Sequence, residues 1–170
     1  MPAWMWTAIR GSTGSKSGQL VNPDVAMRIS TVYACVKVIA ETIASLPLFL
    51  YKRRSDGGKE PAIDHYLFPI IHDRISSELT NYEFFEMALS FLCLNGNSVG
   101  WKQMSASGKL QEIMPLVWQR VQIERKEGRL LYRYNPPANS KIQKQLILTD
   151  KDVWHARNLT TDADGFIGLS

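Results

Sequence analysis

The sequence of 170 residues has only two cysteines, and no stretch of it holds five or six charges of one sign. Cys35 and Cys93 both lie in apolar helical patterns, so we expect two small buried side chains in a reducing compartment and no disulfide framework. Lys plus Arg number 20 against 16 for Asp plus Glu, a mild basic excess that permits contact with nucleic acid without requiring it. With 45% hydrophobic residues, the chain has enough apolar material for one folded domain.

The sequence also lacks the spacings that mark metal sites. Its three histidines, His65, His72 and His155, and its two cysteines form no pair such as Cys-x-x-Cys or His-x-x-x-His. We interpret His155 as a strand histidine with a satisfied hydrogen bond. Spacing does not exclude a Cys–His nucleophile pair, but the burial expected of Cys35 would raise the pKa of its thiol and blunt the thiolate. We therefore assign no catalytic, metal or cofactor-binding residue and expect neither a cofactor nor enzymatic activity.

Two short motifs resemble ligand loops without completing them. Residues 11–17 read Gly-Ser-Thr-Gly-Ser-Lys-Ser, but Ser15 precedes Lys16 where a phosphate-binding loop needs glycine, and no strand leads into the motif. Asp162, Asp164 and Gly165 resemble part of a calcium loop that lacks its bidentate Glu. We interpret the second motif as a polar turn.

The amino-terminal region has linker composition. Residues 11–18 are rich in Gly and Ser and follow Trp4 and Trp6, so we expect residues 1–22 to form a flexible arm that docks on a neighbour, and residues 23–170 to form the folded domain. The first ten residues show no basic leader followed by an apolar core, which argues against a signal peptide. Residues 32–51 are mostly apolar, but Lys37, Glu41 and Pro47 argue against a membrane span.

Two helices are predicted before the sequence changes its period. The first begins at Ser30 and ends before Pro47, and it leads into a predicted strand at residues 48–51. Its predicted inner face consists of Val32, Cys35, Val36, Ile39, Ile43 and Leu46. The second helix begins at Thr80, which forms a capping box with Glu83, and ends at Asn95-Gly96-Asn97. Ile39 and Phe85 are expected to be core residues that join the two helices to the sheet.

From residue 97 onward the pattern alternates as in β-strands. Strands are expected around residues 99–101, 110–116, 121–123, 130–134, 146–148 and 153–156. A weak nucleic-acid pattern, Arg129 and Arg133 interleaved with Tyr132 and Tyr134, fits a half-buried strand at least as well. The fold class is therefore α+β, with two main helices packed on a mostly antiparallel β meander.

The order of these motifs resembles the family of tailed-bacteriophage portal proteins. The resemblance rests on the following segments: residues 32–36 running through Leu46-Pro47-Leu48 into residues 51–53; His65 with its apolar helix; Thr80 with Phe84 and Phe85; residues 94–97; Gly108 with residues 113–116; Arg120-Val121; Tyr132; residues 152–155; and residues 165–170. It covers nearly everything after about Ile29. In the family, the Gly-Leu-Ser motif at residues 168–170 leads into a long stem helix, so the resemblance implies a wing-like part of a subunit, truncated before the stem, clip and crown.

The resemblance implies a structural subunit of a ring, typically a dodecamer, through which double-stranded DNA is packaged into and ejected from the capsid. The partners it implies are other portal subunits, the terminase, a head-tail adaptor, capsid or scaffold proteins and double-stranded DNA, with no membrane. The implied location is the portal vertex of the virion, after synthesis in the cytoplasm of a bacterial host. Three alternatives stay open: a small nucleic-acid-binding module, a cysteine hydrolase, and a decayed prophage remnant without activity.

Overall fold

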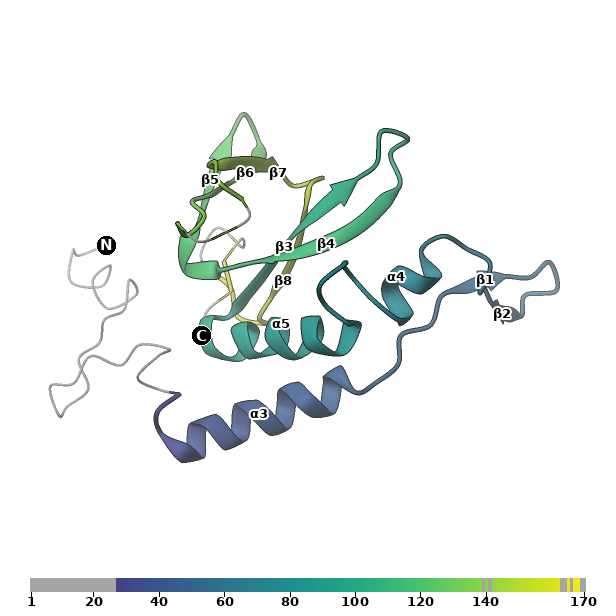
Figure 1. The fold of residues 1–170 in the computed structure, drawn as a ribbon, viewed down its shortest axis with the longest axis horizontal. Coiled ribbons are helices and arrows are strands. Elements are labelled where there is room, and N and C mark those ends of the chain that lie inside the picture. Colours follow the sequence, from purple (N-terminus) through teal and green to yellow (C-terminus); the bar gives the residue numbers. More distant parts are fainter. Residues whose placement is uncertain (1–26, 139, 141, 163–164, 166, 169–170) are drawn as a thin grey trace, which may run out of the picture. The chain divides into compact units, whose positions relative to one another are not determined.

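The computed structural model describes residues 27–138, 140, 142–162, 165 and 167–168 (Figure 1). The chain divides into two compact units, Met1–Val38 and Ile39–Ser170. The predicted arm at residues 1–22 and the Gly-Ser motif at residues 11–17 lie outside the described residues. The strands of the described residues all belong to the second unit.

Helix α3 spans Ser30–Ala44 and crosses the boundary between the units, as the helical period and Pro47 predict. In the second unit it buries its small residues, since Ala40 is 0% exposed and Ala44 is 8% exposed. The prediction that Ile39 is a core residue is wrong, because 47% of this residue is exposed. Ile43 and Leu46, placed on the same predicted inner face, are also exposed. In this unit the helix therefore turns its alanines inward, and Ile39 and Ile43 stay open.

Strands β1 (Tyr51–Arg53) and β2 (Lys59–Pro61) form an antiparallel hairpin around a turn at residues 54–58. The strand expected at residues 48–51 is wrong except for its last residue. Tyr51 pairs with Pro61, and the Ala62 amide still donates to the Leu50 carbonyl at 2.8 Å, but the chain turns at residues 63–64, so the ladder ends there. A short helix, α4 (Phe68–His72), follows with Pro69 in its first turn, where the missing N–H costs nothing.

Helix α5 spans Asn81–Asn95, and both its ends were predicted. The hydroxyl oxygen of Thr80 accepts a hydrogen bond from the Glu83 amide, and the Glu83 carboxylate accepts one from the Thr80 amide. Gly96 ends the helix with a φ of 69°, a left-handed conformation that glycine adopts without strain. The helix packs along strand β3 (Figure 1).

After α5, the strands form two antiparallel sheets of three. They are β3 (Asn97–Met104), β4 (Leu110–Leu116), β5 (Val121–Lys126), β6 (Arg129–Tyr134), β7 (Leu146–Thr149) and β8 (Val153–Arg157), with a 3-10 turn at Trp118–Arg120. One sheet has the order β4-β3-β8 and the other β5-β6-β7. The α+β class is confirmed. Neighbouring strands pair within each sheet as in a meander, but β4 and β5 belong to different sheets, and β8 returns to pair with β3.

Two buried clusters form the core of the second unit. One lies between the two three-stranded sheets and contains Val99, Leu116, Tyr132, Tyr134, Leu148 and Val153. The other joins α5 to the sheet of β3 and contains Ile75, Phe84, Ala88 and Ile113. Phe84 is 1% exposed, whereas Phe85 is only partly buried against this second cluster. The residue that joins helix and sheet most completely is therefore Phe84, next to the predicted Phe85.

Candidate interaction surface

The histidines weighed as candidates for chemistry have separate hydrogen-bond partners. His72 Nδ1 lies 2.7 Å from the Asp73 carboxylate, and His65 Nδ1 accepts a hydrogen bond from the Leu67 amide. Both cysteines are free and exposed, so the prediction that Cys35 and Cys93 are buried is wrong. Their helices keep other faces inward. Among the residues that the structure describes, no group of three His, Cys, Asp or Glu side chains is arranged to hold a metal ion.

The polar turn at Asp162 takes part in local bonding. Its Oδ1 accepts a hydrogen bond from the Ile167 amide at 3.1 Å, and its carbonyl accepts one from Gly165. Residues 163–164 lie outside the described residues. Within the described part of the chain, no helix is long and apolar enough to cross a membrane.

The weak nucleic-acid pattern on β6 does not present aromatic faces. Tyr132 and Tyr134 are 4% and 3% exposed, so their rings are closed to stacking with a base. Arg133, on the opposite face of the strand, forms an ion pair with Glu124 at 3.2 Å. The structure therefore agrees with a half-buried strand.

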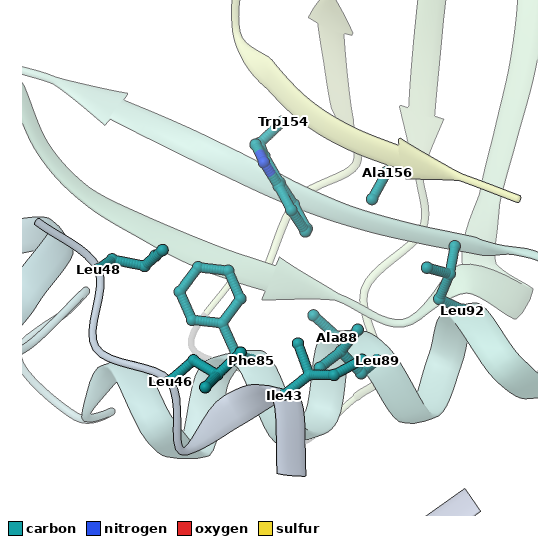
Figure 2. A pocket seen from close by; sticks show the side chains of 9 residues that line it. All are labelled: Ile43, Leu46, Leu48, Phe85, Ala88, Leu89, Leu92, Trp154 and Ala156. Carbon is teal, nitrogen blue, oxygen red and sulfur yellow. The ribbon is translucent and has the colours of Figure 1, made fainter. Parts of the chain in front are cut away.

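An apolar pocket of about 280 Å³ lies open on the second unit (Figure 2). Three parts of the chain line it: the end of α3 with the segment after it, helix α5, and strand β8. The lining residues are Ile43, Leu46, Leu48, Phe85, Ala88, Leu89, Leu92, Trp154 and Ala156. The indole nitrogen of Trp154 is the single polar side-chain atom among them.

Local structure explains why these side chains meet. Phe85, Ala88, Leu89 and Leu92 follow the spacing that puts helical residues on one face of α5. On β8, residues two apart share a face, so Trp154 and Ala156 point to the pocket, and Val153 belongs to the core between the sheets. Pro47 stops α3 and lets Leu46 and Leu48 reach the pocket from the segment that follows (Figure 2).

The apolar surface continues from the pocket along the chain toward the β1–β2 hairpin. Six large side chains between residues 39 and 51 are exposed: Ile39 (47%), Ile43 (46%), Leu46 (62%), Leu48 (45%), Phe49 (47%) and Tyr51 (53%). We call these six residues, with the pocket, the 39–51 surface. A cluster of exposed apolar side chains on one stretch of a soluble domain marks an interaction site, whereas scattered ones do not.

The apolar period singles out Ile39, Ile43 and Leu46 in the sequence, but it predicts them as core. Such a period shows that a side chain prefers to be covered, and it does not show whether its own chain or another chain provides the cover. The sequence carries no local signal that separates the two cases, because the period of α3 is the same whichever chain provides the cover.

The 39–51 surface is an open apolar surface on an α+β domain. Such a surface is typical of a structural subunit that binds other proteins. The family model described as phage portal protein matches residues 30–170. Protein BeeE of Escherichia coli (strain K12) is 32% identical over 115 residues, which are 68% of this chain and 72% of that protein. The chain belongs to the phage portal protein family.

More distant relatives agree with this assignment. The portal protein of Enterobacteria phage HK97 is 23% identical over 151 residues, or 88% of this chain and 34% of that protein. A chain in the neck of an empty GTA particle, solved with C6 symmetry, has the same fold, with a TM-score of 0.64 and 19% identity over 87% of this chain and 39% of its own length. The chain thus spans about a third of the HK97 portal protein, and it has a portal-type structural role.

Proposed function

We propose that this chain is a structural subunit of a phage portal ring that carries double-stranded DNA into and out of a capsid, and that its 39–51 surface binds the neighbouring subunit. The observation that carries the proposal is the family match, which extends over residues 30–170 and so includes α3, both three-stranded sheets and the surface itself. The cyclic symmetry used for the GTA neck supports a ring of like subunits. In this reading, residues 23–170 are the wing-like domain and residues 1–22 an arm.

The size of the 39–51 surface fits a contact between subunits. A large aromatic side chain buries about 150–250 Å² when fully covered, so Phe49 and Tyr51, each about half exposed, together offer roughly 150–250 Å², and the four exposed aliphatic side chains add to this area. A standard stable interface buries about 800 Å² on each partner. The pocket adds depth at one end, where a side chain of the neighbour can enter between Phe85 and Trp154. Ring contacts join two different surfaces, so the neighbour presents another part of its own domain here.

The proposal assigns no bond chemistry to this chain. The terminase, the head-tail adaptor, the capsid or scaffold proteins and DNA are its proposed partners, and the portal vertex of the virion is its proposed location. Synthesis in the cytoplasm of a bacterial host belongs to the same proposal.

A charge placed in the 39–51 surface tests the proposal. We expect the chain alone to be a folded monomer in reversible, weak self-association, without stable closed rings, and Ile43→Glu to raise the dissociation constant at least tenfold, because the carboxylate would lose water on contact. Sedimentation velocity over a range of concentrations measures this. Ile147→Glu is the matched control, since Ile147 is also an exposed isoleucine (63%) but lies on β7.

Two results would contradict the proposal. If Ile43→Glu and Ile147→Glu weakened self-association equally, or if the unaltered chain never associated, the 39–51 surface would not be the contact between subunits. If the chain instead bound duplex DNA tightly with a steep dependence on salt, the nucleic-acid-binding alternative would replace the portal role.

A further inference from the structure

The side chain of Asn97, the first residue of β3, lies in a closed polar network. Asn97 is 0% exposed, and its Nδ2 donates to the carbonyl oxygens of Asn95 at 3.0 Å and of Gly168 at 2.7 Å. Its Oδ1 accepts from the Gly168 amide at 2.8 Å and lies 3.1 Å from His155 Nε2. Asn97 and Gly168 thus form a two-way pair, in which each donates to the other.

These partners fix where the hydrogens lie. Both groups near Nδ2 are carbonyl oxygens, which only accept, so the orientation of the Asn97 amide is determined. His155 Nε2 must then carry the proton that Oδ1 accepts, and His155 Nδ1 is left to accept from the Tyr132 hydroxyl at 3.2 Å. All four polar atoms of the Asn97 amide and the His155 ring are satisfied. The network reaches from β3 through β8 to β6, which belongs to the other sheet.

The chain after β8 returns to this network. The Asn158 amide donates to the carbonyl of Gly96 at 2.9 Å, and Arg157 Nη1 donates to the carbonyl of Gly165 at 2.7 Å. Thr161 and Gly168 form an antiparallel bridge. Gly168 is buried, and a Cβ at this position would overlap the Gly96 carbonyl oxygen and lie 2.6 Å from the Asn158 nitrogen. Only glycine lets the chain come this close to the start of β3.

The segment that follows β8 makes few apolar contacts. Leu159 is 101% exposed, and residues 157–160 are all exposed. A segment with few apolar contacts depends on its hydrogen bonds for local stability. Within a buried network, the loss of one partner leaves others unsatisfied and so weakens the bonds that remain.

We propose that Asn97, with His155 and Gly168, is a latch that fixes the course of the chain at Gly168 relative to both three-stranded sheets, and that the latch opens without unfolding either sheet. Asn97 holds the returning chain through its two hydrogen bonds with Gly168. His155 fixes the position of Asn97, because His155 also bonds to Tyr132 and its ring stacks on that of Trp118 at a centroid distance of 5.8 Å. The latch therefore determines the direction in which the chain leaves the core at Gly168. This inference does not depend on the proposed function.

Tryptic cleavage after Arg157 reports the state of the latch, because the closed latch ties down both residues of the Arg157–Asn158 bond. Cleavage after Lys102, in the middle of β3, reports global unfolding. We expect Asn97→Ala to speed cleavage after Arg157 at least tenfold more than cleavage after Lys102. Asn95→Ala is the matched control, because the Asn95 side chain contacts Phe91 and Gln119, outside the latch. We expect it to leave the ratio of cleavage after Arg157 to cleavage after Lys102 unchanged.

A second pair of variants keeps the proposal testable if Asn97→Ala does not fold. His155→Phe keeps the ring and the Asn97–Gly168 pair, so we expect a smaller rise in cleavage after Arg157. Gly168→Ala should speed cleavage after Arg157 as much as Asn97→Ala does. The double variant His155→Phe/Gly168→Ala should be cleaved there no faster than Gly168→Ala alone, because both changes open the same latch. Equal rises at Arg157 and Lys102 in His155→Phe and Gly168→Ala, or full additivity in the double variant, would overturn the latch.

Discussion

Phe84 holds helix α5 on the sheet of β3, and its removal should cost most of the stability of a small domain. The ring is 1% exposed, lies edge-on to Phe85 with centroids 5.3 Å apart, and lies 5.4 Å from the ring of Trp154. Replacing a buried Phe by Ala costs about 3–5 kcal/mol in total, and the two aromatic contacts of Phe84 favour the upper part of that range. The neighbours Ile75 and Ile113 come from a loop and a strand, so they cannot move together into the cavity. We therefore expect Phe84→Ala to lower the free energy of unfolding by about 4–5 kcal/mol.

Urea titration followed by tryptophan fluorescence measures this change, since Trp154 lies beside the cavity. The midpoint should fall while the slope with denaturant stays unchanged, because the same surface is exposed on unfolding. Tyr82→Ala, an aromatic residue of the same helix with 41% exposure, serves as the control and should cost less than about 1 kcal/mol. A loss below about 2 kcal/mol for Phe84→Ala would refute the assignment of Phe84 as the central contact between α5 and the sheet.

Two further predictions concern local interactions. Burial, and then the charge of Arg157, lower the pKa of His155 from 6.5 to about 4, so between these values the unfolded chain takes up a proton that the folded chain does not. The free energy of unfolding should therefore fall as the pH falls from 7 to 5, with about 1 kcal/mol of that fall due to His155 after allowance for its partial exposure. His155→Phe should remove the part of the fall that is due to His155. If the urea midpoint of His155→Phe fell between pH 7 and pH 5 as much as that of the unaltered chain, the prediction would be contradicted. Thr80→Ala should cost about 0.5–2 kcal/mol by removing the cap of α5, and thermal unfolding of Thr80→Ser, the conservative replacement, would check that the hydroxyl is responsible.

The sequence predicted best the features that local hydrogen bonding decides. Thr80, Glu83 and Gly96 mark both ends of α5, because caps are made within a few residues of each other. The turn at Glu127-Gly128 is equally local, since both residues have positive φ and glycine tolerates it. The alternating strands after residue 97 also appear where the pattern predicts them.

What failed depends on contacts between distant segments. Ile39 and Cys35 lie in an apolar helical pattern, but the pattern does not show which face of α3 is covered. The strand predicted at residues 48–51 begins only at Tyr51, because the opposite chain turns away after Ala62, which only the hairpin register reveals. Asn97 was interpreted only as part of a helix-ending turn, because its other role needs His155 and Gly168, which lie far along the chain.

The pairing of β3 with both β4 and β8 has a consequence for the order of folding. The turn at residues 105–108 brings β4 to β3 with almost no chain to close, so this hairpin forms early. The opposite edge of β3 stays open until Asn97 meets Arg157, and the whole β5-β6-β7 sheet lies between them in sequence. Closing a loop of that length makes the addition of β8 the slow step. During synthesis, the bare edge of β3 is thus exposed to other strands until the residues of β8 have left the ribosome, and this interval is when the chain is most prone to aggregate.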